Sequence, residues 1–213
     1  MHRRKSLFIT LDGIDGCGKS TQLRLLADYL RQQGRKVLLT RDPGGPEISE
    51  KIRQLILHPG HGAMSSRCEL MLYEASRAQL VEEVIRPALA AGKIVLCDRF
   101  FHATLAYQGA GRQLGQPDIR WLNRFATARL VPDLTFILDL NIALARARRQ
   151  RAGKAPDRLE QETTAFHRRI RTAFLAQAQA DPRHLVVIRG NRPAPLIQAE
   201  IRDIIKRKFG RQD

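Results

Sequence analysis

The stretch GIDGCGKST, residues 13–21, decides how the rest of the chain is interpreted. It matches the frame G-x-x-x-x-G-K-[ST] without a gap, with Gly13, Gly18, Lys19 and Ser20 at the fixed positions. Glycines let backbone N–H groups curl around phosphate oxygens, a lysine reaches the outer phosphates, and a hydroxyl can ligate Mg²⁺. We call residues 13–21 the P-loop and expect it to bind ATP and Mg²⁺ through Gly13, Ile14, Asp15, Gly16, Cys17, Gly18, Lys19, Ser20 and Thr21.

The residues on both sides of the P-loop support this interpretation. SLFITLD, residues 6–12, is a short apolar run typical of a buried strand. In residues 21–34, leucines recur at helical spacing, and Gly34 is a suitable C-terminal cap. The alternative is a glycine-rich turn without a ligand. The order strand, loop, helix favours a nucleoside triphosphate site, because the N-terminus of the helix adds its positive dipole.

Strand-like runs alternate with helical patterns along the whole chain. The further strands are predicted at 36–40, 93–97, 134–140 and 184–188, and the further helices at 47–57, 67–91, 117–129, 142–151, 158–180 and 195–209. This alternation predicts an α/β P-loop NTPase fold, with a five-stranded parallel sheet covered by helices on both faces. We expect a single domain over residues 1–213, with a short lid near 146–158.

Composition and charge limit the compartment and the partners. The 213 residues carry 37 Lys and Arg against 21 Asp and Glu, a net charge of +16 that attracts polyanions. Small phosphorylated substrates are the favoured partners and nucleic acid the alternative. Three cysteines form no metal or disulfide pattern and fit a reducing cytoplasm, and no apolar run is long enough for a membrane span. Within the P-loop, neighbouring dipoles are expected to lower the pKa of Cys17.

Two further charged motifs follow predicted strands. RDPGG, residues 41–45, follows the second strand, and DRF, residues 98–100, follows the third. Carboxyl ends of parallel strands meet at one sheet edge, where ligands bind. Asp98 is therefore a candidate Mg²⁺ ligand together with Ser20, although an aspartate there can also be a simple strand-terminal cap. Arg99 can neutralise charge between two phosphoryl groups.

The segment RARRQRAGKAPDR, residues 146–158, is the densest basic run. It holds six basic residues and a single acid, Asp157, and Gly153 and Pro156 interrupt its helical pattern. The segment can be a solvated surface loop or an RNA-binding patch. The functional interpretation is a lid that closes over a triphosphate and delivers an arginine to it.

Taken together, these motifs resemble the thymidylate kinase family. The resemblance rests on the P-loop, RDPGG, YEASRAQ (73–79), DRFFHATLAYQGAGR (98–112) and the basic run before DRLEQE (157–162), and it extends from Leu7 to about Phe174. It implies transfer of the γ-phosphoryl group of MgATP to dTMP, giving dTDP and ADP, by a cytoplasmic homodimer without a membrane partner.

The resemblance also implies an acceptor site. Its residues would be Arg41, Arg53, Tyr73, Arg77, Arg99, Thr104, Tyr107 and Gln108. Tyr73 resembles the aromatic residue that stacks on thymine, Arg77 the residue that bonds its O4 edge, and Tyr107 the one that crowds the ribose 2′ position. From the residues alone, Tyr73 can equally be a core residue and Arg77 a surface arginine.

The catalytic residues implied by the resemblance come from the P-loop, the third strand end and the lid: Asp15, Lys19, Arg99, Arg149 and Arg151. Asp15 resembles an acid that faces the acceptor hydroxyl or the metal. Family members carry the catalytic arginine either in the P-loop or in the lid. Because Gly16 is small and the lid is basic, the chain is similar to the bacterial, lid-supplied form, with Arg149 or Arg151 as the arginine.

Four positions depart from the family pattern. Asp42 stands for a glutamate, Pro46 for a threonine, Ser49 for a glycine and Phe100 for a tyrosine or histidine. Because Asp42 is one methylene shorter, its contacts must shift. The open alternatives are a kinase for another nucleoside monophosphate and a basic, nucleic-acid-stimulated ATPase. The absence of an NKxD motif disfavours a GTPase.

Overall fold

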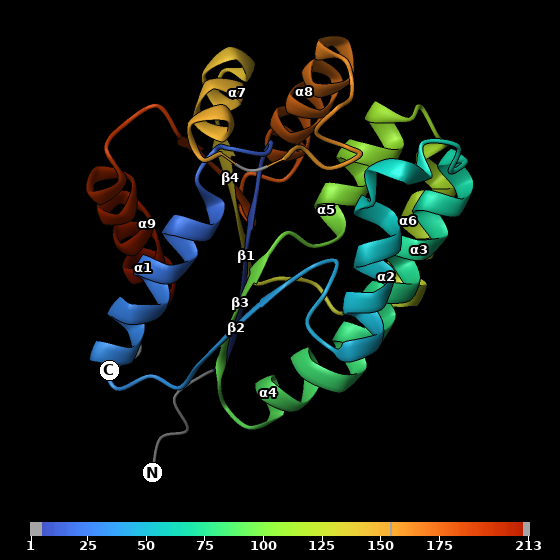
Figure 1. The fold of residues 1–213 in the computed structure, drawn as a ribbon. Helices are drawn as coiled ribbons and strands as arrows, with labels where there is room; N and C mark the ends of the chain where they lie inside the picture. Colours follow the sequence, from blue (N-terminus) through green and yellow to red (C-terminus); the bar gives the residue numbers. More distant parts are fainter. Residues whose placement is uncertain (1–5, 154, 211–213) are drawn as a thin grey trace.

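A parallel β-sheet forms the centre of the computed structural model, which describes residues 6–153 and 155–210. Its strands are β1 (Leu7–Asp12), β2 (Val37–Arg41), β3 (Ile94–Asp98), β4 (Leu134–Asp139) and β5 (Leu185–Arg189). They lie in the order β2-β3-β1-β4-β5, and every pairing is parallel (Figure 1). The predicted five-stranded parallel sheet is confirmed. Since β1 lies at the centre, the P-loop that follows it starts in the middle of the sheet edge.

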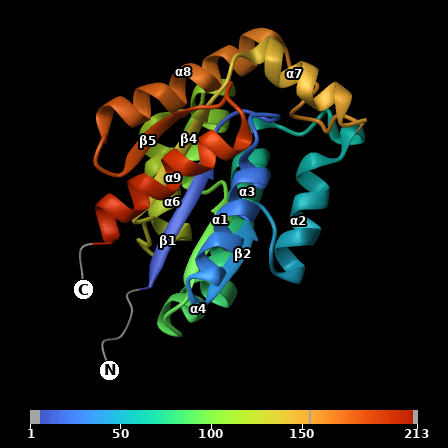
Figure 2. The same ribbon diagram turned by 90° about the vertical axis from the view of Figure 1, so that its left-hand side faces the viewer.

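Helices cover both faces of the sheet (Figures 1 and 2). On one face lie α1 (Lys19–Gln32) and α9 (Ala194–Phe209). The other face carries α3 (Ser66–Leu80), η2 (Val81–Ile85), α4 (Arg86–Ala90), α5 (Phe101–Thr104), η3 (Leu105–Gly111) and α8 (Thr164–Ala180). Outside α3 lie α2 (Glu47–Leu57) and α6 (Gln116–Ala126), and α7 (Ile142–Arg151) lies above the edge where the strands end. The short η1 (Pro59–His61) follows α2.

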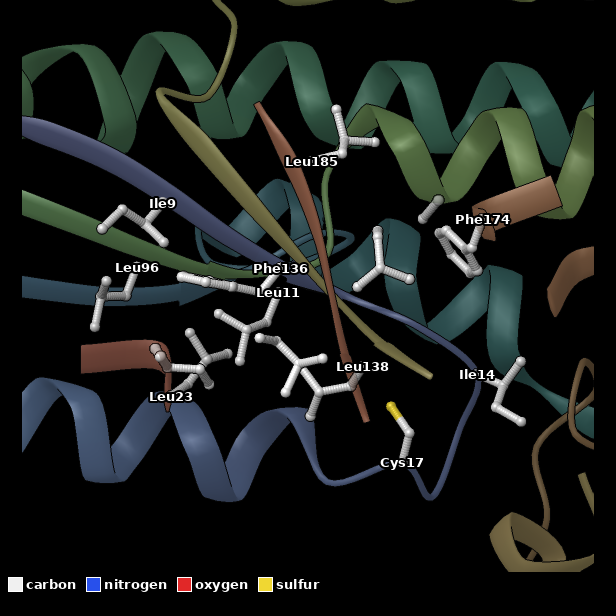
Figure 3. Packing of buried hydrophobic residues seen from close by; sticks show 14 of the residues in the cluster. Ile9, Leu11, Ile14, Cys17, Leu23, Leu96, Phe136, Leu138, Phe174 and Leu185 are labelled. Atoms are coloured by element: carbon white, nitrogen blue, oxygen red, sulfur yellow. The ribbon is translucent and has the colours of Figure 1, made fainter. Parts of the chain in front are cut away.

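The core explains why these segments form a sheet. Every residue of β1 is buried, so the strand is apolar on both faces, as expected for a parallel strand covered by helices. Leu11 of β1, Leu23 of α1 and Leu138 of β4 converge in one cluster with Cys17 (Figure 3). Burial raises the pKa of the Cys17 thiol, so the predicted lowering by loop dipoles is wrong. Cys17 anchors the P-loop to the core.

One helix was not expected from the sequence. Residues 101–111, assigned there only as a motif, form α5 and η3. Glycine is a poor helix former, and Gly109 and Gly111 conceal the pattern. Both glycines lie against neighbouring helices: a Cβ on Gly109 would lie 2.5 Å from Gln116 Nε2, and one on Gly111 would lie 2.7 Å from Phe166 Cε2. At Gly111 the neighbour is the aromatic ring of Phe166 on α8, so close packing favours glycine there, whereas the flexible end of Gln116 on α6 can move away from residue 109.

Other boundaries shift modestly. The helix predicted from residue 158 begins only at Thr164, because the Thr163 hydroxyl accepts a hydrogen bond from Phe166 N and caps it. The predicted helix 67–91 is divided into α3, η2 and α4. No helix within residues 6–153 and 155–210 combines the length and the apolar character needed to cross a bilayer.

Candidate functional site

The P-loop joins β1 to α1 with a backbone that glycine makes possible. Gly13, Gly16 and Gly18 all have positive φ, the last at 103°. At Gly16 space is also limiting, since a Cβ there would lie 2.4 Å from Ala145 O and 3.0 Å from Arg149 Cγ, both on α7. The lid helix therefore packs directly on the P-loop, and its Arg149 stem occupies the space that a side chain at residue 16 would need.

Lys19 and Ser20 place a cation and a hydroxyl at the mouth of the loop. Lys19 Nζ donates to the carbonyls of Gly13 and Ile14, at 3.2 Å each, and lies 3.7 Å from Asp15 Oδ1. Ser20 Oγ donates to Asp98 Oδ2 at 2.7 Å, so the two predicted Mg²⁺ ligands lie together. Because α1 begins at Lys19, its N-terminal dipole adds to this positive field.

Arg99 crosses from the end of β3 to the P-loop. Its backbone adopts a left-handed conformation with φ of 70°, which is rare for a residue with a side chain and is concentrated at functional sites. Its Nη1 donates to Gly13 O at 2.7 Å and its Nη2 to Asp15 Oδ1 at 2.6 Å. The Tyr107 hydroxyl donates to the other Asp15 oxygen at 2.9 Å. These contacts fix Arg99, Asp15 and Tyr107 as one unit.

The charge state of Asp15 follows from this unit. Burial alone would raise the pKa of Asp15, but Arg99 and Lys19 outweigh it and hold the pKa below its usual range. The carboxylate is therefore ionised at neutral pH and serves as an acceptor for the guanidinium and the phenol.

Arg77 is fully buried rather than on the surface. Its Nε donates to Asp42 Oδ2 at 2.6 Å, and Nη1 donates to Glu74 Oε1 and Asn123 Oδ1 at 2.9 and 2.7 Å. Nη2 donates to Thr104 Oγ1 at 2.7 Å. A guanidinium has five N–H donors, so the described contacts engage four and leave one on Nη2, next to Thr104. Burial opposes the charge of Arg77, but the carboxylates of Asp42 and Glu74 dominate and raise its pKa.

Two cavities meet at this edge of the sheet. The larger, about 1100 Å³, extends along the P-loop and also contacts Arg41, Asp98, Arg148 and Arg149. The smaller, about 50 Å³, is lined by the predicted acceptor residues Tyr73, Arg77, Thr104, Tyr107 and Gln108. Five residues line both cavities: Asp15, Asp42, Arg53, Arg99 and Asp157. The cavities are therefore neighbours with Arg99 in their common wall.

The structure separates the two predicted lid arginines. Arg149 lines the larger cavity, and its Nη1 lies 3.3 Å from Glu160 Oε1. Arg151 is exposed on the same helix and is not among the described residues that line the cavity. Arg41, the last residue of β2, forms a two-bond pair with Glu50, and Arg53 of α2 donates to Pro43 O at 2.8 Å.

Known proteins share this architecture and this sequence. The family model for thymidylate kinase matches residues 11–201. A thymidylate kinase from an Exiguobacterium species is 48% identical over 197 residues, and one from Clavibacter sepedonicus is 48% identical over 196, each match covering 92% of both chains. The crystal structure of thymidylate kinase from Ehrlichia chaffeensis superposes with a TM-score of 0.78 at 32% identity, covering 95% of this chain and 99% of that one. The chain belongs to the thymidylate kinase family.

The positions that depart from the family pattern are accommodated in different ways. Asp42, one methylene shorter than glutamate, is buried and bonds Arg77. Pro46 precedes the first residue of α2, and the Ser49 hydroxyl donates to Ser76 O at 2.8 Å. Phe100 packs edge-on against Phe8, with ring centroids 4.9 Å apart. In this thymidylate kinase the substituted residues are thus part of the packed support of the site.

Sequence reasoning missed several polar residues behind the site. Glu74 and Asn123 brace Arg77, and Arg148 and Arg192 line the larger cavity. Asp12 ends β1 fully buried, with no described hydrogen-bond partner for either carboxylate oxygen. Burial raises the pKa of Asp12 to about 7, although Arg99 and Lys19 oppose the shift. The only sequence signal for Asp12 was a carboxylate at the end of an apolar strand.

Proposed function

We propose that the chain transfers the γ-phosphoryl group of MgATP to dTMP, giving dTDP and ADP, with the two nucleotides meeting at Arg99. Membership of the thymidylate kinase family makes dTMP phosphorylation the reaction and ATP the phosphate donor. The observation that carries the proposed geometry is the wall shared by the two cavities, which contains Asp15, Arg53 and Arg99. Phosphoryl transfer requires in-line positioning and charge neutralisation, and within the shared wall the guanidinium groups of Arg53 and Arg99 supply the cations, while Asp15 holds Arg99 in place.

The larger cavity is the proposed ATP site. The P-loop N–H groups and Lys19 hold the phosphates, and the other end of the cavity, lined by Arg192, Ala194 and Ile197, receives the nucleoside. Its volume of about 1100 Å³ accommodates a nucleotide together with the lid side chains.

Ser20 and Asp98 are the proposed Mg²⁺ site. They supply a hydroxyl and a carboxylate 2.7 Å apart beside Lys19. Mg²⁺ prefers oxygen ligands and is commonly bound by one or two protein groups plus substrate phosphates, so this donor set fits it. When bound, Mg²⁺ neutralises charge on the β- and γ-phosphates. No cluster of three acidic, histidine or cysteine side chains within the described residues offers a complete metal site.

The smaller cavity, together with the adjoining part of the larger one along their shared wall, is the proposed dTMP site; because about 50 Å³ is less than a nucleotide occupies, dTMP must displace some of the lining side chains when it binds. Tyr73 provides an aromatic face for the base, and the remaining Nη2–H of Arg77 provides a donor for a carbonyl oxygen such as O4 of thymine. Thr104, Gln108 and Tyr107 line the same space, and we assign to Tyr107 the role of limiting room beside the sugar. Arg53 and Arg99, with Arg41 from the β2 end, hold the acceptor phosphate.

Catalysis is assigned to cations. Lys19 and Arg99 neutralise the transferring group, and Arg149 joins them from the lid, because its stem already packs on Gly16 at the P-loop. Arg151 becomes the alternative if lid closure rotates α7. Asp15 orients Arg99 through the 2.6 Å bond and faces the acceptor sugar. Because its pKa is low, it is a weak proton acceptor, and no general base is required.

A homodimer is proposed from the outer face of α2, α3 and α6. Exposed apolar residues on these adjacent helices are Ile48, Leu55, Met71, Trp121 and Phe125. Trp121 and Phe125 stack with ring centroids 5.6 Å apart and are 64% and 75% exposed. Exposed apolar side chains gathered on helices that pack against one another are typical of a protein interface. We also propose that the chain acts as one domain with its lid, in the cytoplasm.

A panel of monophosphates tests this proposal. ADP release is measured with ATP and, separately, dTMP, dUMP, dCMP and dGMP. We expect dTMP to give the highest kcat/KM and dCMP to be poor, since its 4-amino group cannot accept the Arg77 hydrogen. A preference for another monophosphate, or stimulation by nucleic acid instead of dTMP, would contradict it.

A further inference from the structure

Glu69, on the inner face of α3, is the centre of a buried charge network. Its side chain is 0% exposed. One carboxylate oxygen accepts hydrogen bonds from Gln108 Nε2 at 2.8 Å and Arg112 Nε at 3.1 Å. The other accepts from Arg112 Nη2 at 3.0 Å and lies 2.7 Å from Arg158 Nη2. A single buried carboxylate thus contacts two guanidinium groups and an amide.

The three partners of Glu69 come from different parts of the site. Gln108 belongs to η3 and lines the acceptor cavity. Arg158 is the last residue of the lid segment, residues 146–158. Its Nε donates to Ile56 O at 2.8 Å and its backbone N to Leu57 O at 3.1 Å, so it is fixed to the C-terminal end of α2.

Arg112 extends the network toward α8. Its Nη1 donates to Glu162, and its guanidinium lies 4.8 Å from the ring centroid of Phe166. The network therefore connects the acceptor wall with both the lid return, residues 157–162, and the start of α8.

The charge balance keeps this arrangement together. Burial opposes ionisation of Glu69, but the hydrogen bonds from Arg112 and Gln108 outweigh it and lower its pKa. An ionised buried carboxylate with two cationic partners has few alternative positions, because separating any pair leaves a charge unpaired in a low dielectric. Gln108 and Arg158 therefore contact the same carboxylate, and the position of that carboxylate depends on both of them.

We propose that Glu69 is a positioning residue that couples occupancy of the acceptor site to placement of the lid over ATP. The inference rests on the acceptor and lid assignments proposed above. Asp157 and Leu159, which flank Arg158, both line the acceptor cavity, and Asp157 also lines the ATP cavity. Gln108 is already bonded to Glu69 and the stem of Arg149 already packs on Gly16, so a dTMP contact with Gln108 would stabilise the arrangement that the Glu69–Arg158 contact maintains at the lid return.

Ligand linkage tests this role directly. The dissociation constant of a non-hydrolysable ATP analogue is measured by calorimetry with and without saturating dTMP. In the wild type we expect dTMP to tighten it by at least about fivefold. In Glu69→Gln, which removes the charge and retains the shape, we expect the ratio to fall to about 1. Glu47→Gln, an exposed glutamate on α2, is the matched control and should keep the wild-type ratio.

The outcomes separate a coupling role from a structural one. If Glu69→Gln weakens both ligands but leaves the ratio unchanged, or if the wild type has a ratio of 1, the proposal is wrong. Should Glu69→Gln not fold, Arg158→Lys keeps the charge but replaces the two donor nitrogens that contact Ile56 O and Glu69 with a single ammonium nitrogen, and it should lower the ratio. Turnover of dTMP by the wild type is recorded in parallel, so that failure of the acceptor assignment is recognised independently.

Discussion

The two cavities of this kinase are built in opposite ways. The cavity proposed for ATP is wide, about 1100 Å³, and is lined by consecutive residues of one loop together with side chains near solvent. The cavity proposed for the acceptor is about 50 Å³, and it is lined by side chains from α3, α5 and η3, several of which are hydrogen-bonded to one another or to the P-loop. A backbone cradle accepts any triphosphate of suitable shape. A rigid network of paired side chains instead discriminates between bases, because a mismatched base leaves a buried donor unsatisfied.

The largest expected effect lies where the two cavities meet. We expect Lys19→Ala and Arg99→Ala each to lower kcat by about a thousandfold, about 4 kcal/mol of barrier, because charge on the transferring phosphoryl group is no longer neutralised. ADP release under saturating substrates measures this. Lys51→Ala, an exposed lysine on α2, is the control and should be close to wild type. Near-normal turnover of a folded Arg99→Ala protein would contradict the proposal that the two nucleotides meet at Arg99.

Stability distinguishes the two regions next. Arg77→Met leaves Asp42 and Glu74 buried without their cation, and we expect a loss of about 3 kcal/mol in the free energy of unfolding. Arg41→Met breaks an ion pair that is half exposed, so the loss should stay below about 1 kcal/mol. Urea denaturation of both variants makes the comparison. Equal losses of unfolding free energy would show that the buried contacts of Arg77 with Asp42 and Glu74 stabilise the fold no more than the exposed Arg41–Glu50 pair does.

The pH dependence of stability reports on Asp12 beneath the P-loop. Its folded pKa of about 7 lies above the ordinary value of 3.8, so the folded protein holds this proton more tightly than the unfolded chain does. The resulting stabilisation is fully present below the unfolded pKa and is lost as the pH rises through the folded pKa. Relative to Asp12→Asn, we expect the wild type to lose about 2 kcal/mol between about pH 5 and about pH 8. Urea denaturation at a series of pH values measures the free energy of unfolding of both proteins. The same pH dependence in the two would contradict the raised pKa of Asp12.

The smallest expected effect concerns the hydroxyl that joins the regions. Tyr107→Phe removes the bond to Asp15 but keeps the ring, so about 1 kcal/mol of stability and about a fivefold loss in kcat/KM for dTMP are expected. Two steady-state series measure it, one with dTMP varied at saturating ATP and one with ATP varied at saturating dTMP. Tyr29→Phe, on the opposite face of the sheet in α1, is the matched control. If only the KM for ATP changes, Tyr107 belongs to the ATP site, and its assignment to the acceptor site is wrong.

The same contrast determines what could be predicted from the sequence. The sheet, the P-loop and the Ser20–Asp98 pair were predictable, because strand periodicity and a contiguous motif specify them locally. Among the partners of Arg77, Glu74 lies three residues earlier on the same helix, but Asp42 and Asn123 were not predictable, since they reach Arg77 only through packing of the β2 end and α6 against α3. The helix at residues 101–111 was not predicted, because Gly109 and Gly111 are residues more typical of a loop than of a helix. Glu69 belongs to no recognisable motif. Its contacts with Gln108, Arg112 and Arg158 are seen only in the folded structure.

The measurement that tests the central claim most directly uses one molecule in which adenosine and thymidine are joined through a chain of phosphates. If the two nucleotides meet at Arg99, this molecule should bind at least about a hundredfold more tightly than ATP or dTMP alone, because the second contact is intramolecular. Arg99→Ala should remove most of that gain. Binding no tighter than that of ATP alone would contradict the account.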